Sequence, residues 1–219
     1  MVTVAACSDT TSIPSAPSSR SLSPTAPVFD FANTGHAFGL QNSDFTLTSR
    51  GGSFSVGGLY TVNFPENAVC DPDNSKYGPS EWDNACTTLS AGQAIKVHAV
   101  LSLQSGGLAI DFSPALRFSP DAQVTISTDI FASVIKWNRD YFAKHPESLN
   151  FLAIYYAPNF DSSPVKDFAS DASVITHVNL NSGRIWRRVK HFSGYSVTSG
   201  LACDPSPGNP DCVQVEGQP

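Results

Sequence analysis

The sequence predicts a mainly β protein: an antiparallel β-sandwich with one helix, preceded by a disordered N-terminal tether. Short runs of alternating apolar and polar residues, separated by Gly, Pro and Asn, indicate strands. Only one stretch has apolar residues at helical spacing. The 41% hydrophobic content of the 219 residues is enough for a packed core. We therefore divide the chain into four segments: residues 1–27, 28–90, 91–200 and 201–219.

The first segment, residues 1–27, is expected to be an unfolded tether. Residues 8–27 are rich in Ser, Pro and Thr and too poor in apolar side chains to fold. The VAAC motif before them, which ends at Cys7, resembles a bacterial lipobox, whose Cys carries a diacylglyceryl anchor. Residues 1–6 lack the basic and long apolar parts of a signal peptide, which predicts a start codon further upstream. The alternative is a cytosolic chain with a chance Ala-Ala-Cys.

The next two segments carry the expected strands and the helix. Residues 28–90 form an N-terminal β region and residues 91–200 the sandwich. Strands are expected within 44–49 and on both sides of Gly57-Gly58 within 52–65, and then at 94–103, 108–112, 124–126 and 149–156. Gly57-Gly58 indicates a turn or a bulge. Apolar residues fall at helical spacing over 128–144, where Thr128 or Asp129 can cap the start and Pro146 ends the run. This stretch is predicted to be the one helix.

The five cysteines divide into two pairs and one left over. Cys70 with Cys86, and Cys203 with Cys212, each close a short loop rich in Pro, Asp and Asn, which favours disulfides over zinc ligation. The acidic side chains of the first loop have no Ca²⁺-loop spacing, so we expect a solvated loop held by its disulfide and no metal site. The second bridge is expected to hold a surface turn in residues 201–219. Cys7 remains as the lipidation site.

A long β-hairpin is predicted on both sides of Asn181-Ser182-Gly183. With a two-residue Ser182-Gly183 turn, Leu180 lies opposite Ile185, and the register continues toward His191. The alternation of a strand then places His191 and Ser193 on the same apolar face, directed toward the core. It places Phe192 on the mostly polar face, and it leaves Arg187 unexplained.

The tripeptide His191-Phe192-Ser193 has the residue types needed for cleavage of its own backbone. In a strained peptide, Ser193 Oγ can attack the Phe192 carbonyl carbon while His191 removes the hydroxyl proton, and water then cleaves the resulting ester. Gly194 offers a place for the chain to bend and bring the side chains together. A simple hydrogen bond between His191 and Ser193 inside a sandwich is the alternative.

The HFS motif and its surroundings resemble a bacterial ZU5-like β-module with an autoproteolysis motif. The resemblance includes GGLAIDFSPALRFSPDAQVTIS at residues 106–127, FLAIYYAP at 151–158 and the hairpin with HFSGY at 171–200. It covers roughly residues 90 to 200. By this resemblance Ser193 is the nucleophile and His191 its helper.

Composition and motifs limit the function. A net charge of −6 with only 13 Lys and Arg argues against nucleic acid as a partner. We interpret the only short basic group as a solvated strand edge; its members are Arg184, Arg187, Arg188 and Lys190. No motif of an enzyme acting on an external substrate is recognised, and no cofactor is expected.

Two functional hypotheses follow from this reasoning. The first is a lipoprotein of the bacterial cell envelope, periplasmic or exposed on the surface. It has a non-enzymatic ZU5-like domain that binds an unknown protein or carbohydrate or has a structural role, and it is attached to the membrane through Cys7. The second is the same domain cleaving itself once between Phe192 and Ser193.

Overall fold

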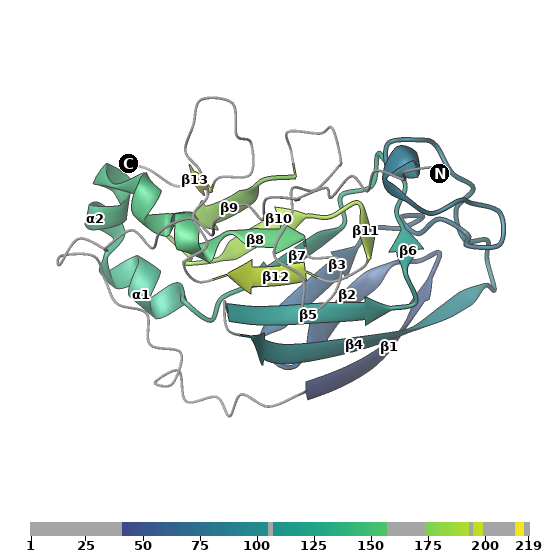
Figure 1. The fold of residues 1–219 in the computed structure, drawn as a ribbon, viewed down its shortest axis with the longest axis horizontal. Coiled ribbons are helices and arrows are strands. Elements are labelled where there is room, and N and C mark those ends of the chain that lie inside the picture. Colours follow the sequence, from purple (N-terminus) through teal and green to yellow (C-terminus); the bar gives the residue numbers. More distant parts are fainter. Residues whose placement is uncertain (1–40, 105–106, 157–173, 193–194, 199–212, 217–219) are drawn as a thin grey trace, which may run out of the picture. The chain divides into compact units, whose positions relative to one another are not determined.

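The computed structural model describes residues 41–104, 107–156, 174–192, 195–198 and 213–216 (Figure 1). Within them the protein is mainly β, as the alternating pattern predicts, and its strands form a five-stranded, a six-stranded and a two-stranded sheet. All strand pairs but one are antiparallel in the described part of the chain. The sandwich class expected from the sequence is therefore confirmed.

The five-stranded sheet has the order β1-β4-β5-β12-β8. Its strands are β1 (Gln41–Thr48), β4 (Ala94–Gln104), β5 (Gly107–Ser113), β12 (Tyr195–Thr198) and β8 (Ile154–Tyr156). β1 and β4 pair over their whole common length, from Gln41 opposite Leu101 to Thr48 opposite Ala94. β12, late in the chain, lies between two earlier strands and pairs with both.

The six-stranded sheet has the order β13-β9-β10-β7-β3-β2. Its strands are β13 (Gln214–Glu216), β9 (Thr176–Asn179), β10 (Ile185–Arg188), β7 (Thr125–Thr128), β3 (Tyr60–Phe64) and β2 (Gly52–Val56). Gly57 and Gly58 both have positive φ and form the turn between β2 and β3. Both large sheets combine strands from residues 28–90 with strands from residues 91–200.

The two-stranded sheet pairs β6 (Leu116–Arg117) with β11 (His191–Phe192). The chain from Ile185 to Thr198 is therefore not the single strand that its composition suggests, because β10, β11 and β12 belong to three different sheets. This segment crosses from the six-stranded to the five-stranded sheet. β11 lies at the crossing.

The register of the β9–β10 hairpin differs by two residues from the predicted one. Ile185 lies opposite Val178 rather than Leu180. The Asn179 amide donates to the Arg184 carbonyl oxygen at 2.9 Å, so the connection is longer than a two-residue turn. Gly183 takes a positive φ of 72°, as expected for the turn glycine. A shift by two residues keeps each side chain of β9 and β10 on its predicted face.

The predicted single helix is two short ones, α1 (Ala132–Trp137) and α2 (Arg139–Lys144). Asn138 separates them, and its side-chain amide donates to the Val134 carbonyl oxygen at 2.9 Å, in competition with the helical backbone. Thr128 does not cap the start, because it ends β7 and its hydroxyl donates to the Leu59 carbonyl oxygen at 2.8 Å.

Short 3-10 helices complete the described elements: η2 (Pro79–Glu81) and η3 (Pro146–Leu152). η3 takes up most of the stretch predicted as a strand at 149–156, leaving only β8. Pro146 lies at the start of η3, where the missing amide hydrogen costs no hydrogen bond.

Aromatic side chains of the two large sheets, and Phe118 just after β6, pack against each other. Phe45 of β1 stacks on Phe54 of β2, with ring centroids 4.6 Å apart, and so joins the five-stranded to the six-stranded sheet. Phe64 of β3 lies edge to face with Phe118 at 5.6 Å. Burial raises the pKa of the Tyr60 hydroxyl far above its ordinary value, so the phenol stays neutral.

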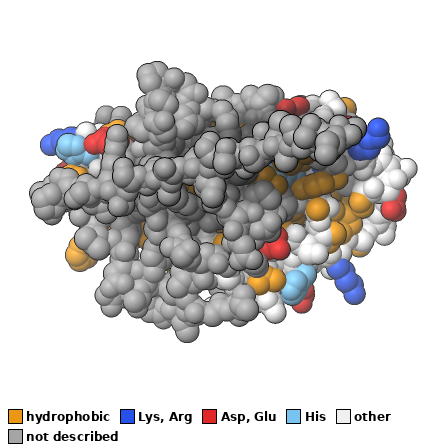
Figure 2. All heavy atoms as spheres, viewed as in Figure 1, with side chains coloured by type: hydrophobic (Ala, Val, Ile, Leu, Met, Phe, Trp, Pro, Cys, Tyr) orange, Lys and Arg blue, Asp and Glu red, His pale blue; other side chains and the backbone are white. Residues whose placement is uncertain are grey.

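The described surface carries charges of both signs. Figure 2 shows acidic and basic side chains in small mixed groups on the face in view. His98 Nδ1 lies 2.7 Å from Asp44 Oδ1, and His145 Nδ1 lies 3.4 Å from Glu147 Oε1. None of the helices in the described residues is long and apolar enough to cross a bilayer.

Candidate functional site

The two described residues of the HFS motif form β11, and Phe192 is fully packed in the core. Its ring stacks on Phe112 of β5, with centroids 3.9 Å apart, and lies edge to face with Phe64 at 5.4 Å and Phe118 at 5.0 Å. The expectation that Phe192 lies on a polar face is wrong. The alternation of β10 ends at Arg188, and β11 starts again on a different partner strand with both of its side chains buried.

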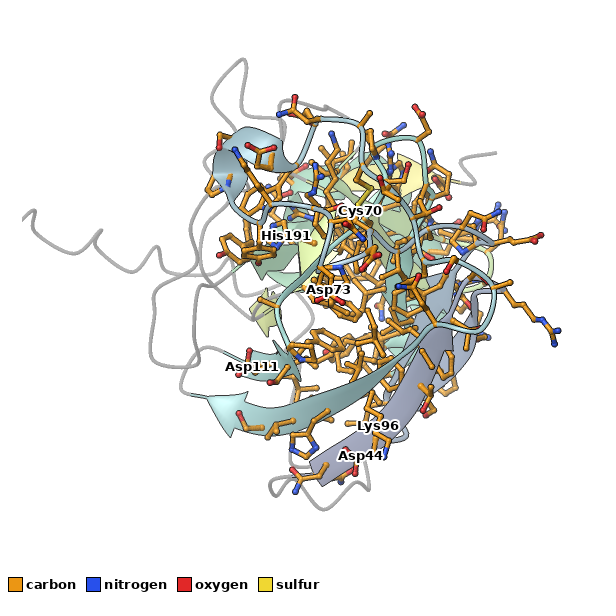
Figure 3. All side chains as sticks on the ribbon, turned by 90° about the vertical axis from the view of Figure 1, so that its right-hand side faces the viewer. Asp44, Cys70, Asp73, Lys96, Asp111 and His191 are labelled. Carbon is orange, nitrogen blue, oxygen red and sulfur yellow. A yellow bond between two sulfur atoms is a disulfide. The ribbon has the colours of Figure 1, made fainter. Side chains whose placement is uncertain are left out.

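His191 is fully buried, as its predicted position facing the core requires. Its imidazole stacks on the indole of Trp82, with ring centroids 3.7 Å apart and an interplanar angle of 13°. Tyr156 of β8 meets it edge to face at 4.7 Å. Figure 3 shows His191 on the side of the protein that carries Cys70 and the long loop after it.

Trp82 comes from residues 70–86, which we call the covering loop. The loop was expected to be solvated, yet the Trp82 side chain is only 1% exposed. Its indole occupies the space over β11 and shields the imidazole from water. An aromatic residue within an otherwise polar disulfide loop is the sequence signal that indicates such packing.

A hydrogen bond connects the covering loop to the carbonyl of Phe192. The Tyr77 hydroxyl donates to the Phe192 carbonyl oxygen at 2.9 Å. This is the carbonyl of the peptide bond between Phe192 and Ser193. Tyr77 is 43% exposed, so its ring closes the site at the surface while its hydroxyl reaches the backbone. Sequence reasoning missed this residue, because the two partners lie 115 positions apart.

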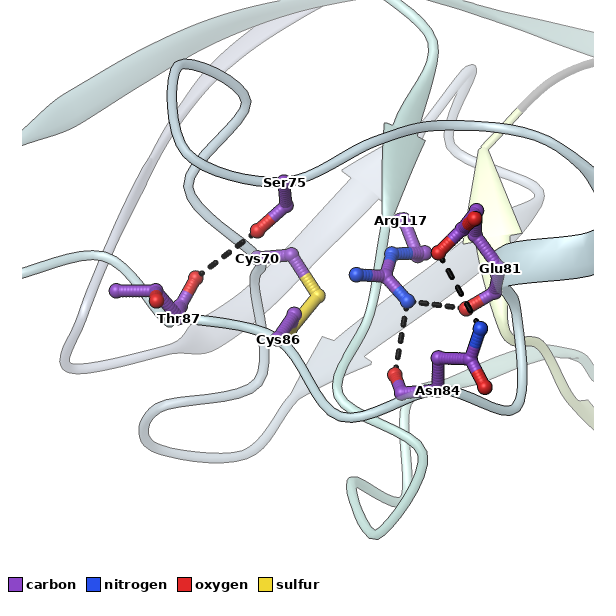
Figure 4. The surroundings of a disulfide bond; sticks show 7 residues. All are labelled: Cys70, Ser75, Glu81, Asn84, Cys86, Thr87 and Arg117. Atoms are coloured by element: carbon purple, nitrogen blue, oxygen red, sulfur yellow. Dashed lines mark hydrogen bonds between the residues drawn. A yellow bond between two sulfur atoms is a disulfide. The ribbon is translucent and has the colours of Figure 1, made fainter.

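Two charged side chains fix the covering loop to the strands beneath it. Lys190, one residue before β11, pairs with Asp83. The Arg117 guanidinium of β6 donates to the carbonyl oxygens of Glu81 and Asn84, the second at 2.8 Å (Figure 4). Because Arg117 lies opposite His191, both strands of the small sheet bind the same loop.

The predicted disulfide between Cys70 and Cys86 is present and joins the two ends of the covering loop (Figure 4). The Cys70 amide donates to the Arg117 carbonyl oxygen at 3.0 Å, so the first end is attached to β6. Next to it, hydrogen bonds from Asn74, Gln93 and the Asp73 amide lower the pKa of the Asp71 carboxyl. The ionised carboxylate therefore organises the start of the loop.

The basic residues of the β10–β11 segment are mostly buried, which corrects their interpretation as a solvated edge. The Arg187 guanidinium donates to the Ile154 carbonyl oxygen and joins β10 to β8, which explains a residue that the pattern left unexplained. Arg188 donates to the Ala122 carbonyl oxygen at 3.1 Å. Only Arg184 of the four is exposed. The other three, Arg187, Arg188 and Lys190, are bound to carbonyl oxygens or a carboxylate, because a buried charge needs such partners.

Several predicted site residues lie outside the described residues: Ser193, Cys7, Cys203 and Cys212. Among the residues that the structure describes, no group of three His, Cys, Asp or Glu side chains is placed to hold a metal ion. The arrangement around β11 is that of a peptide carbonyl with a hydroxyl donor at its oxygen and a buried imidazole on the preceding residue. A hydroxyl donor at a carbonyl oxygen is one of the groups found at sites where a nucleophile attacks the carbonyl carbon.

Comparisons with protein-family models, with curated proteins and with solved structures find no match to this chain.

Removing the disulfide should loosen the covering loop and lower stability. Replacing Cys70 and Cys86 together by Ser frees a closed loop with a sequence separation of 16, and the free energy of unfolding should fall by about 3 kcal/mol. Urea denaturation followed by intrinsic fluorescence measures the change. The matched control, Cys7→Ser in the segment expected to be a tether, should leave the midpoint unchanged. Equal midpoints for all three proteins would contradict this role of the disulfide.

Proposed function

We propose that this domain cleaves its own backbone once, between Phe192 and Ser193. The observation that carries the proposal is the hydrogen bond from the Tyr77 hydroxyl to the Phe192 carbonyl oxygen. A donor at that oxygen stabilises the negative charge that develops when a nucleophile attacks the carbonyl carbon. The next residue along the chain, Ser193, supplies a hydroxyl nucleophile.

The reaction has two steps. In the first, Ser193 Oγ bonds to the Phe192 carbonyl carbon, the bond from that carbon to the Ser193 nitrogen breaks, and the hydroxyl proton passes through His191 to the leaving amine. The result is an ester with the same atoms as the original peptide. In the second step one water molecule cleaves the ester, leaving a carboxylate on Phe192 and a free amine and hydroxyl on Ser193. No cofactor takes part.

The packing of β11 supports this chemistry by fixing the reacting carbonyl. Phe192 is held between Phe112 and Phe118 from the core side, and Tyr77 binds its carbonyl from the covering loop. A group held in one orientation needs no further ordering to reach the attack geometry. The His191 imidazole is fully buried against Trp82, on the residue that precedes the reacting carbonyl.

Cleavage should be visible on a denaturing gel. The purified protein of 23.3 kDa should give fragments of about 20 and about 3 kDa, because neither predicted disulfide joins residues on the two sides of the cut. Ser193→Ala should remain intact, since it lacks the attacking oxygen, whereas Ser193→Thr keeps a hydroxyl and should still cleave. Hydroxylamine should accelerate cleavage by attacking the ester. One intact wild-type band, confirmed by intact mass, would overturn the proposal.

The same fragments should elute together without denaturant. The smaller fragment contains β12, which pairs with β5 on one side and β8 on the other. Size-exclusion chromatography should therefore show one native species that separates only in urea. Fragments that separate in native buffer would mean that cleavage follows unfolding rather than a reaction of the folded domain.

Replacing Tyr77 should slow the reaction without abolishing it. Tyr77→Phe removes the donor at the Phe192 carbonyl oxygen and keeps the ring, so the rate of fragment formation should fall by about 10- to 100-fold. Rates are measured on gels after refolding. The control Tyr141→Phe removes a hydroxyl paired with Ser148 on α2 and η3, and should cleave at the wild-type rate. Equal rates for both variants would exclude a role for the Tyr77 hydroxyl.

A non-enzymatic binding or structural role is the second candidate function. Trp137, at the end of α1, is 90% exposed. An indole in this position is a typical anchor for a protein or carbohydrate partner. If the wild-type protein stays intact, this second function becomes the proposal for the domain.

For both functions we propose attachment to the bacterial cell envelope through a lipid on Cys7. The support is the VAAC motif followed by the Ser, Pro and Thr-rich residues 8–27, whose composition is that of a flexible tether. Expression from an extended upstream start should yield protein whose N-terminal peptide carries a diacylglyceryl mass on Cys7. Cys7→Ser should lose both this mass and membrane association. A wild-type N-terminal peptide without this added mass would contradict lipid attachment at Cys7.

A further inference from the structure

The edge of the six-stranded sheet is completed by β13, the last strand that the structure describes. β13 pairs with β9 in parallel, with Gln214 opposite His177 and Val215 opposite Val178. It is the only parallel pair among the described strands. β13 has three residues, of which Gln214 is exposed and the other two are half-buried. Little apolar surface therefore holds this strand in place.

The bonds between β13 and the sheet are of the kind that recognises an extended peptide. The Leu180 amide donates to the Glu216 carbonyl oxygen at 3.0 Å, which adds to the strand pairing. One side-chain contact accompanies it: His177 Nδ1 lies 2.8 Å from Glu216 Oε1. Main-chain bonds supply general affinity for a strand, and the carboxylate on the imidazole supplies selection.

β9, the strand with which β13 pairs, is held in place by contacts that do not involve β13. β9 pairs with β10 on its other side, and its Thr176 and Val178 side chains are completely buried. His177 is held by Trp186 of β10, with stacked rings 4.0 Å apart. The edge of β9 and the imidazole therefore stay in position when the terminal strand leaves.

We propose that the edge of β9 is an acceptor site for an extended peptide with a carboxylate, and that residues 213–216 of a second copy of this chain can occupy it in place of the chain's own strand. The occupant that the structure places there is this segment, so an identical segment from another copy makes the same bonds. Exchange of identical elements joins two copies at little cost in free energy, because each bond lost within one chain is regained between chains. A vacant strand edge otherwise exposes unpaired amides and carbonyls.

Two experiments with the full-length chain test this site. Both use the Ser193→Ala background, which keeps the chain in one piece whether or not the wild type cleaves. The additional change Glu216→Pro removes the amide of a residue whose backbone faces β9, together with the carboxylate on His177, and should vacate the edge. A labelled peptide of residues 213–219 should then bind at least tenfold more tightly than to the Ser193→Ala chain, measured by fluorescence anisotropy. Most of this gain in affinity should be lost when His177 of the chain is also replaced by Ala. It should likewise be lost when the peptide carries Gln in place of Glu at position 216.

The second experiment tests the identity of the occupant. Mixing the Glu216→Pro chain with a mass-tagged Ser193→Ala chain should give mixed dimers in native mass spectrometry, whereas the Glu216→Pro chain alone should stay monomeric. If Glu216→Pro unfolds by circular dichroism, Glu216→Ala replaces it. No gain in peptide binding would overturn the acceptor site. Peptide binding without mixed dimers would overturn the assignment of a second copy.

Discussion

The ring of Phe192 is the contact on which the arrangement of this domain depends. It stacks on Phe112 of the five-stranded sheet and meets Phe64 of the six-stranded sheet, at the place where the chain crosses from one to the other. An aromatic ring at such a crossing removes a large apolar area from water and fixes the backbone direction on both sides. The adjoining carbonyl is held in place by the same packing.

The covering loop shows how a mostly polar segment becomes part of a buried site. Its two ends are joined by a disulfide, and Arg117 and Lys190 bind it from below through its carbonyl oxygens and a carboxylate. These bonds satisfy charges that would otherwise be costly to bury. With the loop fixed, Trp82 can cover the imidazole of His191 and Tyr77 can reach the Phe192 carbonyl. The loop thus contributes to the site as much as β11 does.

The sequence predicted the parts of the fold that depend on local patterns. Alternation located β1 to β5, Gly57-Gly58 located a turn, and loop composition paired Cys70 with Cys86. It did not predict the division of the chain after Arg188, because a strand that changes partner keeps a strand-like composition. The burial of Phe192 and the contact of Tyr77 with its carbonyl depend on residues more than seventy positions apart, and such contacts leave no periodicity in the sequence.

The place of β12 in its sheet has a consequence for when this domain takes shape during synthesis. β12 fills the position between β5 and β8, and it comes after nearly all other strands in the chain. Until residue 198 has left the ribosome, β5 and β8 have no common neighbour, and the sandwich cannot close. A nascent chain released too early would expose two open strand edges to other proteins.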